Sequence, residues 1–188
     1  MCEPADIDLA ERLAALAGGV IRGYFRTAIS VDDKADASPV TIADRNAEAA
    51  MRAVLERERP NDGIIGEEHG RTRGDASRQW VLDPIDGTKS FISGIPVFGT
   101  LIALLQDGAP ILGIIDQPIS GERWIGATGR PSTLNGRPIS VRPTEALGNA
   151  TLFATHPDMF AGDDAERFTT LRESVKLTRY GGDCYAYG

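Results

Sequence analysis

The segment Trp80–Phe91, W-V-L-D-P-I-D-G-T-K-S-F, constrains the fold more than any other part of this chain. Its first three residues form an apolar run typical of a buried strand, which would deliver Asp83 at its end. Pro84 cannot donate to a strand ladder, so we expect the strand to stop there. Asp86 follows three residues after Asp83. Two carboxylates on a stiff turn, beside the free backbone N–H groups of a helix start, suit a hard cation bound next to a phosphate.

A second acidic corner lies upstream, where Gly63–Glu68 reads G-I-I-G-E-E. A short run of β-branched residues is again followed by acidic residues, so folding could bring Glu67 to the same pocket as Asp83 and Asp86. Magnesium takes oxygen ligands, which favours carboxylates and carbonyls over His and Cys. Phosphate monoesters hydrolyse very slowly unaided, and bound metal ions both neutralise the phosphoryl group and activate water. The two corners together therefore predict Mg²⁺-dependent phosphate chemistry.

The charge balance narrows the range of partners. Acidic residues outnumber basic ones, 27 to 20, which gives a net charge of −7. Nonspecific nucleic-acid and membrane binding favour basic surfaces, so we expect no nucleic-acid and no membrane partner. Two cysteines supply no disulfide framework, and the chain starts without the basic and apolar segments of a signal peptide. These features predict a cytoplasmic location.

The hydrophobic pattern predicts a layered helix–sheet protein of one domain, or one and a half. Apolar residues at helical spacing predict two amphipathic helices near the N-terminus, and short apolar runs between turn residues predict strands after them. The expected helices are 6–27, 41–59, 163–174 and the start of one at 183–188; the expected strands are 64–65, 80–82, 97–105, 111–116, 123–127, 151–154 and 175–178. The sequence L-N-G-R at 134–137 predicts a hairpin.

Three motifs in register carry a family resemblance: P-V-T-I-A-D at Pro39–Asp44, G-E-E at Gly66–Glu68 and D-P-I-D-G-T at Asp83–Thr88. Their order and spacing resemble those of the inositol monophosphatase superfamily. Within it, the chain looks most like the histidinol-phosphate phosphatase branch. The stretches that carry this closer likeness are K-A-D-A-S-P-V-T (34–41), F-G-T-L-I-A-L (98–104), D-Q-P-I-S-G-E-R-W (116–124) and T-R-Y-G-G-D-C-Y-A-Y-G (178–188).

The resemblance implies an α+β fold, a layered α/β sandwich of the inositol monophosphatase/fructose-1,6-bisphosphatase type. Members of the superfamily continue well beyond the position of Gly188, with more sheet and a further metal-binding aspartate. The chain therefore resembles a C-terminally truncated, N-terminal fragment. We expect residues 1–145 to form the metal- and phosphate-binding half, with a helix pair and a sheet, and residues 146–188 to begin an incomplete C-terminal α/β half.

The resemblance also implies a set of metal ligands. Glu67, Asp83 and the Ile85 carbonyl would hold one Mg²⁺, and Asp83 would bridge to a second Mg²⁺ that Asp86 also holds. Taken alone, each aspartate is equally an ordinary turn residue, because Asp-Gly is among the commonest turn pairs. Glu68 is expected to be solvated or to support the ligands rather than to be one.

The catalytic residues that the resemblance implies are Asp44, Thr88 and Glu67. Asp44 and the Thr88 hydroxyl would pair, and together they would orient and deprotonate the attacking water. The residues expected to bind the phosphorylated substrate are Ile85, Asp86, Gly87, Thr88, Gly181, Gly182 and Asp183. Simpler alternatives stay open, because Asp44 is also an ordinary first-turn helix acid and Thr88 an ordinary N-cap.

Asp183 is the residue on which substrate choice depends. By resemblance, the G-G-D sequence lies over the organic half of the substrate, where inositol-specific members usually carry a small residue. A carboxylate there suits a cationic partner, and histidinol phosphate offers an ammonium and an imidazole. Neutral inositol would leave the charge unpaired, at a cost if it is buried. The alternative is that Asp183 only caps a terminal helix.

The leading hypothesis is thus a Mg²⁺-dependent histidinol-phosphatase of histidine biosynthesis, acting on a small phosphomonoester. One alternative is an inositol monophosphatase or related small-molecule phosphatase, and another, from a different class, is a non-catalytic truncated fragment. His69 and His156 have no identified partner and are not expected to be catalytic. The sequence leaves the oligomeric state open, with a homodimer as one expectation.

Overall fold

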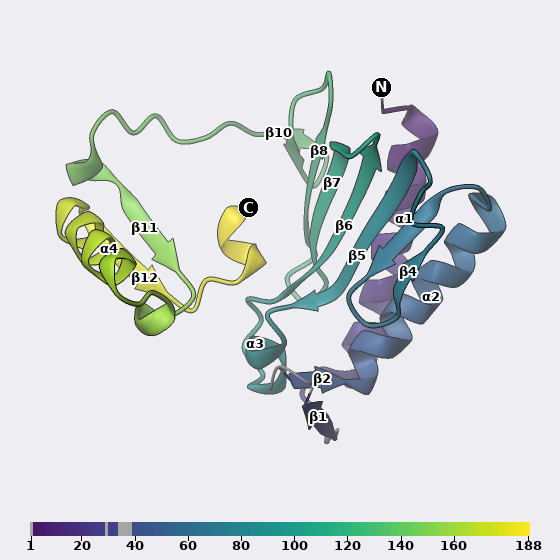
Figure 1. The fold of residues 1–188 in the computed structure, drawn as a ribbon, viewed down its shortest axis with the longest axis horizontal. Helices are drawn as coiled ribbons and strands as arrows, with labels where there is room; N and C mark the ends of the chain where they lie inside the picture. The colour runs from purple at the N-terminus through teal and green to yellow at the C-terminus, as the bar shows by residue number, and fades with distance from the viewer. Residues whose placement is uncertain (1, 29, 34–38) are drawn as a thin grey trace.

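An eight-stranded mixed sheet forms the centre of the molecule (Figure 1). The computed structural model describes residues 2–28, 30–33 and 39–188. The strands lie side by side in the order β10 (Arg137–Pro138), β9 (Thr133–Leu134), β8 (Glu122–Ala127), β7 (Ala109–Gln117), β6 (Gly99–Gln106), β5 (Arg78–Asp86), β3 (Gly63–Gly66) and β4 (Gly70–Thr72). Within the described part of this sheet, β3 and β5 are the one parallel pair, and the other neighbouring strands pair antiparallel. The parallel pairing matters for the site, because it brings the ends of β3 and β5 together.

Two long helices, α1 (Pro4–Tyr24) and α2 (Ile42–Glu58), cover one face of this sheet (Figure 1). α1 packs on β6 and β7, and α2 packs on β5. Both begin with a capping box, formed by Glu3 with Asp6 in α1 and by Thr41 with Asp44 in α2. Each box satisfies backbone N–H groups that the first helical turn leaves without a partner. The predicted helix pair is confirmed, although α1 ends three residues earlier than expected.

The other face of the sheet carries an apolar cavity of about 740 Å³. Residues alternate along β6 and β7: Ile102 and Ile114 are buried in the core beneath the helices, whereas Leu101 and Ile115 stay partly exposed at the cavity. Asp83 lies at the cavity wall, and so does Gly188 at the end of the chain. The cavity therefore opens next to the predicted metal ligands.

The expectation that strand β5 would stop at Pro84 is wrong. The strand does not stop before it but continues to Asp86, with Asp83 opposite Leu101 and Asp86 opposite Gly99. The register shifts between these two pairs, so Pro84 lies in an irregularity where no ladder N–H is required. Thr100 Oγ1 donates to the Pro84 carbonyl at 2.8 Å, which fixes this irregular segment.

A smaller unit follows the sheet in sequence. Its strands β11 (Thr151–Ala154) and β12 (Leu177–Tyr180) pair in parallel, and α4 (Asp163–Ser174) connects them (Figure 1). The predicted helix at 163–174 and strand at 151–154 are confirmed, whereas the last strand lies two residues later than expected. Residues 183–188 were expected to start an α-helix, but Cys184–Tyr187 form the 3₁₀ turn η3. The division at residue 145 stays a prediction.

The remaining elements are short. They are β1 (Val31–Asp33) and β2 (Pro39–Thr41), which pair as a ribbon, α3 (Thr88–Ile92), and the 3₁₀ turns η1 (Leu147–Asn149) and η2 (Pro157–Met159). None of the helices in the described ranges has the length and apolar character needed to cross a bilayer.

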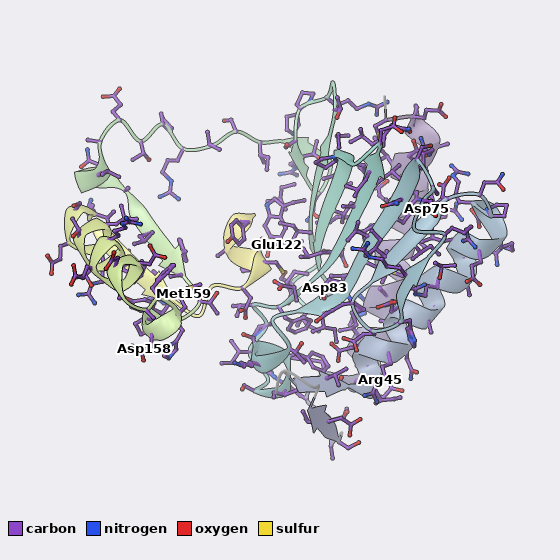
Figure 2. All side chains as sticks on the ribbon, viewed as in Figure 1. Arg45, Asp75, Asp83, Glu122, Asp158 and Met159 are labelled. Atoms are coloured by element: carbon purple, nitrogen blue, oxygen red, sulfur yellow. The ribbon has the colours of Figure 1, made fainter. Side chains whose placement is uncertain are left out.

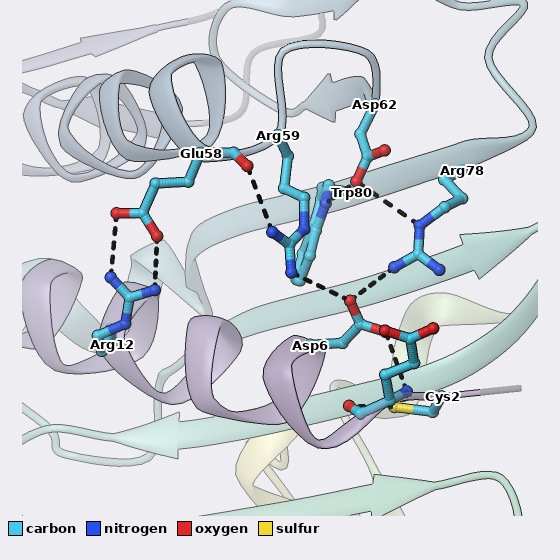
Figure 3. A network of polar contacts seen from close by, with 9 residues as sticks. Cys2, Asp6, Arg12, Glu58, Arg59, Asp62, Arg78 and Trp80 are labelled. Carbon is cyan, nitrogen blue, oxygen red and sulfur yellow. Dashed lines mark hydrogen bonds and ion pairs between the residues drawn. The ribbon is translucent and has the colours of Figure 1, made fainter.

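A polar network fastens the start of β5 to the start of α1, at the end of the strand away from Asp83 (Figure 3). Asp6 Oδ1 accepts from Arg78 Nη2 at 2.6 Å, and Asp62 Oδ2 accepts from Trp80 Nε1 at 2.9 Å. Burial alone would raise the pKa of Asp6, but hydrogen bonds from the Glu3 backbone and Arg78 outweigh it and lower the pKa. This network ties β5 to the helix layer, which positions the acidic end of the strand.

Candidate active site

Asp83 lies toward the end of the sheet nearest to α3 (Figure 2), and three other carboxyl groups act on it. Burial raises the pKa of Asp83 to about 9, and the charges of Glu67, Asp86 and Asp44 add to this effect. A side-chain hydrogen bond links Asp83 to Glu67. The structure thus brings Glu67 to Asp83, as the sequence predicted, because β3 runs parallel to β5 and Glu67 N donates to Leu82 O at 3.1 Å.

Asp44 is the fourth acid of this cluster and is almost fully buried. Its Oδ2 accepts from Thr41 Oγ1 at 2.6 Å and from Thr41 N at 2.9 Å. Burial raises the pKa of Asp44, and the Glu67 charge acts in the same direction. One oxygen of the carboxylate is therefore used by the helix cap, and the other, Oδ1, is buried without a hydrogen-bond partner among the described residues.

Thr88 and Asp44, both among the described residues, form no direct hydrogen bond with each other, and their joint action on a water molecule stays a prediction. Thr88 Oγ1 donates to the Ile85 carbonyl at 3.1 Å, and the hydroxyl that reaches Asp44 belongs to Thr41. Both hydroxyls satisfy acceptors that lie close in sequence, at the start of α3 and at the start of α2. The T-I-A-D spacing of a capping box was the signal that could have identified Thr41 from sequence.

The cluster offers oxygen atoms that suit a divalent cation. Within the described ranges, Asp44 Oδ1 and Asp83 Oδ1 are buried without a hydrogen-bond partner. Buried carboxylate oxygens that face one another repel unless a proton or a cation lies between them. A hard cation such as Mg²⁺ prefers this donor set, so the residues fit the metal that the sequence predicted. The described side chains nevertheless include no three acidic, His or Cys groups already arranged to hold a metal ion.

The residues near the end of the chain that were predicted to bind the substrate lie at the same site. Cys184 N donates to Asp86 Oδ2 at 2.7 Å, and Ser90 Oγ donates to Asp183 Oδ2 at 2.6 Å. Gly87 has φ +89°, and a Cβ there would lie 2.7 Å from Asp183 Oδ2. The 183–184 segment therefore packs directly against the D-G-T corner, and only glycine leaves room for it.

Gly181 and Gly182 lead into this contact. Gly181 has φ +74°, and a Cβ on Gly182 would lie 2.9 Å from the Ala186 side chain. The sequence did not identify Ser90 or the Cys184 N–H as partners of the site, because their partners are more than ninety residues away.

The other singled-out residues lie outside the cluster or are not described. His69 Nε2 lies 3.1 Å from the Arg45 carbonyl, and His156 is exposed and caps a short turn. That neither histidine is catalytic stays a prediction. The K-A-D-A-S segment at 34–38 lies outside the described residues.

Comparison with known proteins decides the family. A model described as "Inositol monophosphatase family" matches residues 5–187. The chain belongs to the inositol monophosphatase family. The resemblance predicted from the three motifs is confirmed, and so is the α+β layered fold.

Relatives within this family carry more than one kind of name. The chain is 52% identical over 177 residues to "Bifunctional phosphatase IMPL2, chloroplastic" of Arabidopsis thaliana, a match that covers 93% of this chain and 51% of that protein. It is 40% identical over 189 residues to a histidinol-phosphatase of Mycobacterium tuberculosis, covering 97% of this chain and 73% of the relative. The chain thus spans about half the length of the plant relative.

Solved structures support the same fold. An inositol monophosphatase from Zymomonas mobilis aligns with a TM-score of 0.87 and 53% sequence identity, over 98% of this chain and 71% of that one. The extragenic suppressor protein suhB from Bartonella henselae aligns with a TM-score of 0.86 and 28% identity, over 95% of this chain and 71% of the other. The family fold therefore applies to nearly all of this chain.

Proposed function

We propose that this chain carries the metal- and phosphate-binding part of a Mg²⁺-dependent phosphomonoesterase that converts histidinol phosphate to histidinol and inorganic phosphate. The observation that carries the proposal is the cluster of buried acids at the ends of β3 and β5, where Asp83 forms a side-chain hydrogen bond with Glu67 and Asp83 Oδ1 is buried without a partner among the described residues. Such a concentration of buried acid is typical of a functional site. Relatives named histidinol-phosphatase support the substrate.

The residues that would hold the metal are Glu67, Asp83, Asp86 and the Ile85 carbonyl. A bound Mg²⁺ would neutralise the phosphoryl oxygens and make water more acidic. The Ile85 carbonyl accepts from Thr88 Oγ1, so this hydroxyl fixes the orientation of a proposed ligand. Gly87 and Thr88 would offer backbone N–H groups to the phosphate.

Asp44 is proposed as the general base. Thr41 occupies its Oδ2 with two hydrogen bonds, which leaves Oδ1 as the atom that can accept a proton from water. Burial raises the pKa of Asp44, and a carboxylate with a raised pKa is a stronger base. The Thr41 bonds hold this carboxylate in one orientation, which a general base needs.

Asp183 is proposed to bind the cationic half of the substrate. Its carboxylate is held over Gly87 by the Ser90 hydroxyl, next to the D-G-T corner that would bind phosphate. An ammonium or imidazolium group can pair with it, whereas neutral inositol cannot. The second candidate is an inositol monophosphatase, which the 53% identity to the Zymomonas mobilis enzyme favours.

Phosphate release from histidinol phosphate and from inositol 1-phosphate tests the proposal, each measured with Mg²⁺ and after its removal with EDTA. We expect Mg²⁺-dependent release with a higher kcat/KM for histidinol phosphate. Asp83→Asn should abolish the activity, and the exposed Asp158→Asn serves as the matched control. A preference for inositol 1-phosphate would support the second candidate, and a folded chain inactive on both would contradict the enzyme proposal.

A further inference from the structure

Glu48 of α2 is a fully buried acid that the proposed metal site does not use. Its Oε1 accepts from Arg52 Nε at 2.6 Å and from His69 N at 3.2 Å, and its Oε2 accepts from Glu68 N at 2.7 Å. Two of these three donors are backbone groups directly after Glu67. The carboxylate therefore binds the turn that carries a proposed metal ligand.

Arg52 binds the far side of the same turn. Its Nη1 donates to Thr72 Oγ1 at 3.1 Å, and its Nη2 donates to the Gly70 carbonyl. Glu48 and Arg52 lie one helical turn apart on α2, so their side chains meet on one face. Together they hold the backbone between β3 and β4 at both its start and its end.

Gly66 shows how closely α2 approaches this turn. A Cβ at Gly66 would lie 1.8 Å from Glu48 Oε1, so only glycine fits beneath the carboxylate. On the other side, Glu67 N donates to Leu82 O, one residue before Asp83. Residue 67 is thus held between β5 and the Glu48 carboxylate, and its side chain forms a hydrogen bond with Asp83.

Stability alone is a weak explanation for this ion pair. Burying two charges costs desolvation free energy, and well-packed apolar residues of similar volume often stabilise a fold as much. Directional hydrogen bonds, by contrast, fix the backbone around a ligand. The chain uses such bonds at the one turn from which Glu67 reaches Asp83.

We propose that Glu48, supported by Arg52, is a positioning residue that orients Glu67 for metal binding. This inference rests on the proposed function, because it takes Glu67 as a ligand. Loss of the Glu48 carboxylate would free the 67–69 backbone and allow Glu67 to turn away from Asp83. Residues that orient metal ligands typically change metal affinity 10- to 100-fold when they are replaced.

The test is a Mn²⁺ titration of the 188-residue chain followed by electron paramagnetic resonance of the free ion. We expect Glu48→Gln to weaken Mn²⁺ binding at least tenfold. Glu58→Gln is the matched control, because Glu58 lies on the same helix and pairs with Arg12 at the surface; its Kd should stay within about twofold of the wild-type value. Hydrogen exchange of residues 66–70 should speed up in Glu48→Gln and not in the control.

A purely structural role predicts a different result. Glu48→Gln would then lower Tm in EDTA but leave both the Mn²⁺ Kd of the folded protein and hydrogen exchange at 66–70 unchanged, which overturns the proposal. If Glu48→Gln does not fold, Arg52→Lys takes its place under the same criteria, because lysine keeps the charge but loses the bonds to Thr72 and Gly70. Failure of the wild-type chain to bind Mn²⁺ would contradict the proposed function itself.

Discussion

The hydroxyl of Ser90 donates a 2.6 Å hydrogen bond to Asp183 Oδ2, across 93 positions of sequence. Cys184, which follows Asp183, donates its N–H to Asp86 Oδ2. These two bonds join residues 86–90, which include the end of the D-P-I-D-G-T corner, to residues 183–184, so the proposed phosphate side and the proposed substrate side form one site. Specificity and metal binding are therefore expected to respond to changes in the same few residues.

Ser90→Ala should weaken recognition of a cationic substrate. A hydrogen bond to a charged group contributes about 1.5–3 kcal/mol, so its loss should raise KM for histidinol phosphate by roughly 10- to 150-fold. The KM for inositol 1-phosphate should hardly change. Steady-state kinetics on both substrates measure the difference, and the exposed Ser93→Ala, on the turn that ends α3, is the control. Equal effects on the two substrates would argue against a role for Asp183 in charge recognition.

Asp44→Asn should remove the proposed base while keeping the helix cap. The amide oxygen can still accept from Thr41, so folding should be retained. General-base catalysis contributes about 10²–10⁴-fold, and kcat should fall within this range while KM changes little. Asp8→Asn, an exposed acid on α1, is the control. A variant with wild-type kcat would show that Asp44 is only a capping residue.

Gly87→Ala should combine backbone strain with a clash. The left-handed conformation costs a non-glycine residue about 1–2 kcal/mol, and the added Cβ would also displace the Asp183 carboxylate. Gly121→Ala separates the two effects, because Gly121 has φ +73° with open space around its Cβ position. Denaturant unfolding should show a similar loss of stability in both variants. The KM for histidinol phosphate should rise only in Gly87→Ala. A raised KM in both would point to a general effect of destabilisation.

Asp6→Asn should destabilise the fold in a pH-dependent manner. The pKa of Asp6 is lowered in the folded state, so its contribution is fully present above the unfolded value of about 3.9 and is lost as pH falls through the folded value. We expect a loss of about 2 kcal/mol at pH 7 that shrinks below pH 4. Urea unfolding at pH 7, 4 and 2.5 measures this, with Asp8→Asn as the control. A difference that stays constant with pH would contradict the role of the Asp6 charge.

The sequence predicted the parts of the site that depend on local pattern. The apolar run before Asp83 and the β-branched run before Glu67 identified the two strands, and the parallel pairing of β3 with β5 then brought the acids together. Strand periodicity and turn residues also gave the order of elements. These features are encoded within a few neighbouring positions, which is why they could be read directly.

Contacts between distant segments could not be read in the same way. The apolar side of α2 was visible, but the burial of Glu48 and Arg52 depends on the turn at 66–72 that packs against them. Similarly, the partner of Asp86 is a backbone N–H, which any residue except proline could supply at position 184. Pro84 shows that a local rule can also mislead. Proline interrupts a regular strand ladder because it lacks an N–H, but β5 is irregular at this position and continues past it.

Calorimetric titration of Mg²⁺ into the metal-free chain tests the central claim most directly, with Asp83→Asn and the control Asp158→Asn measured beside the wild type. The acid cluster predicts saturable Mg²⁺ binding that Asp158→Asn retains and Asp83→Asn weakens at least tenfold. Equal Mg²⁺ affinity in the wild type and Asp83→Asn, or no binding by the folded wild-type chain, would contradict it.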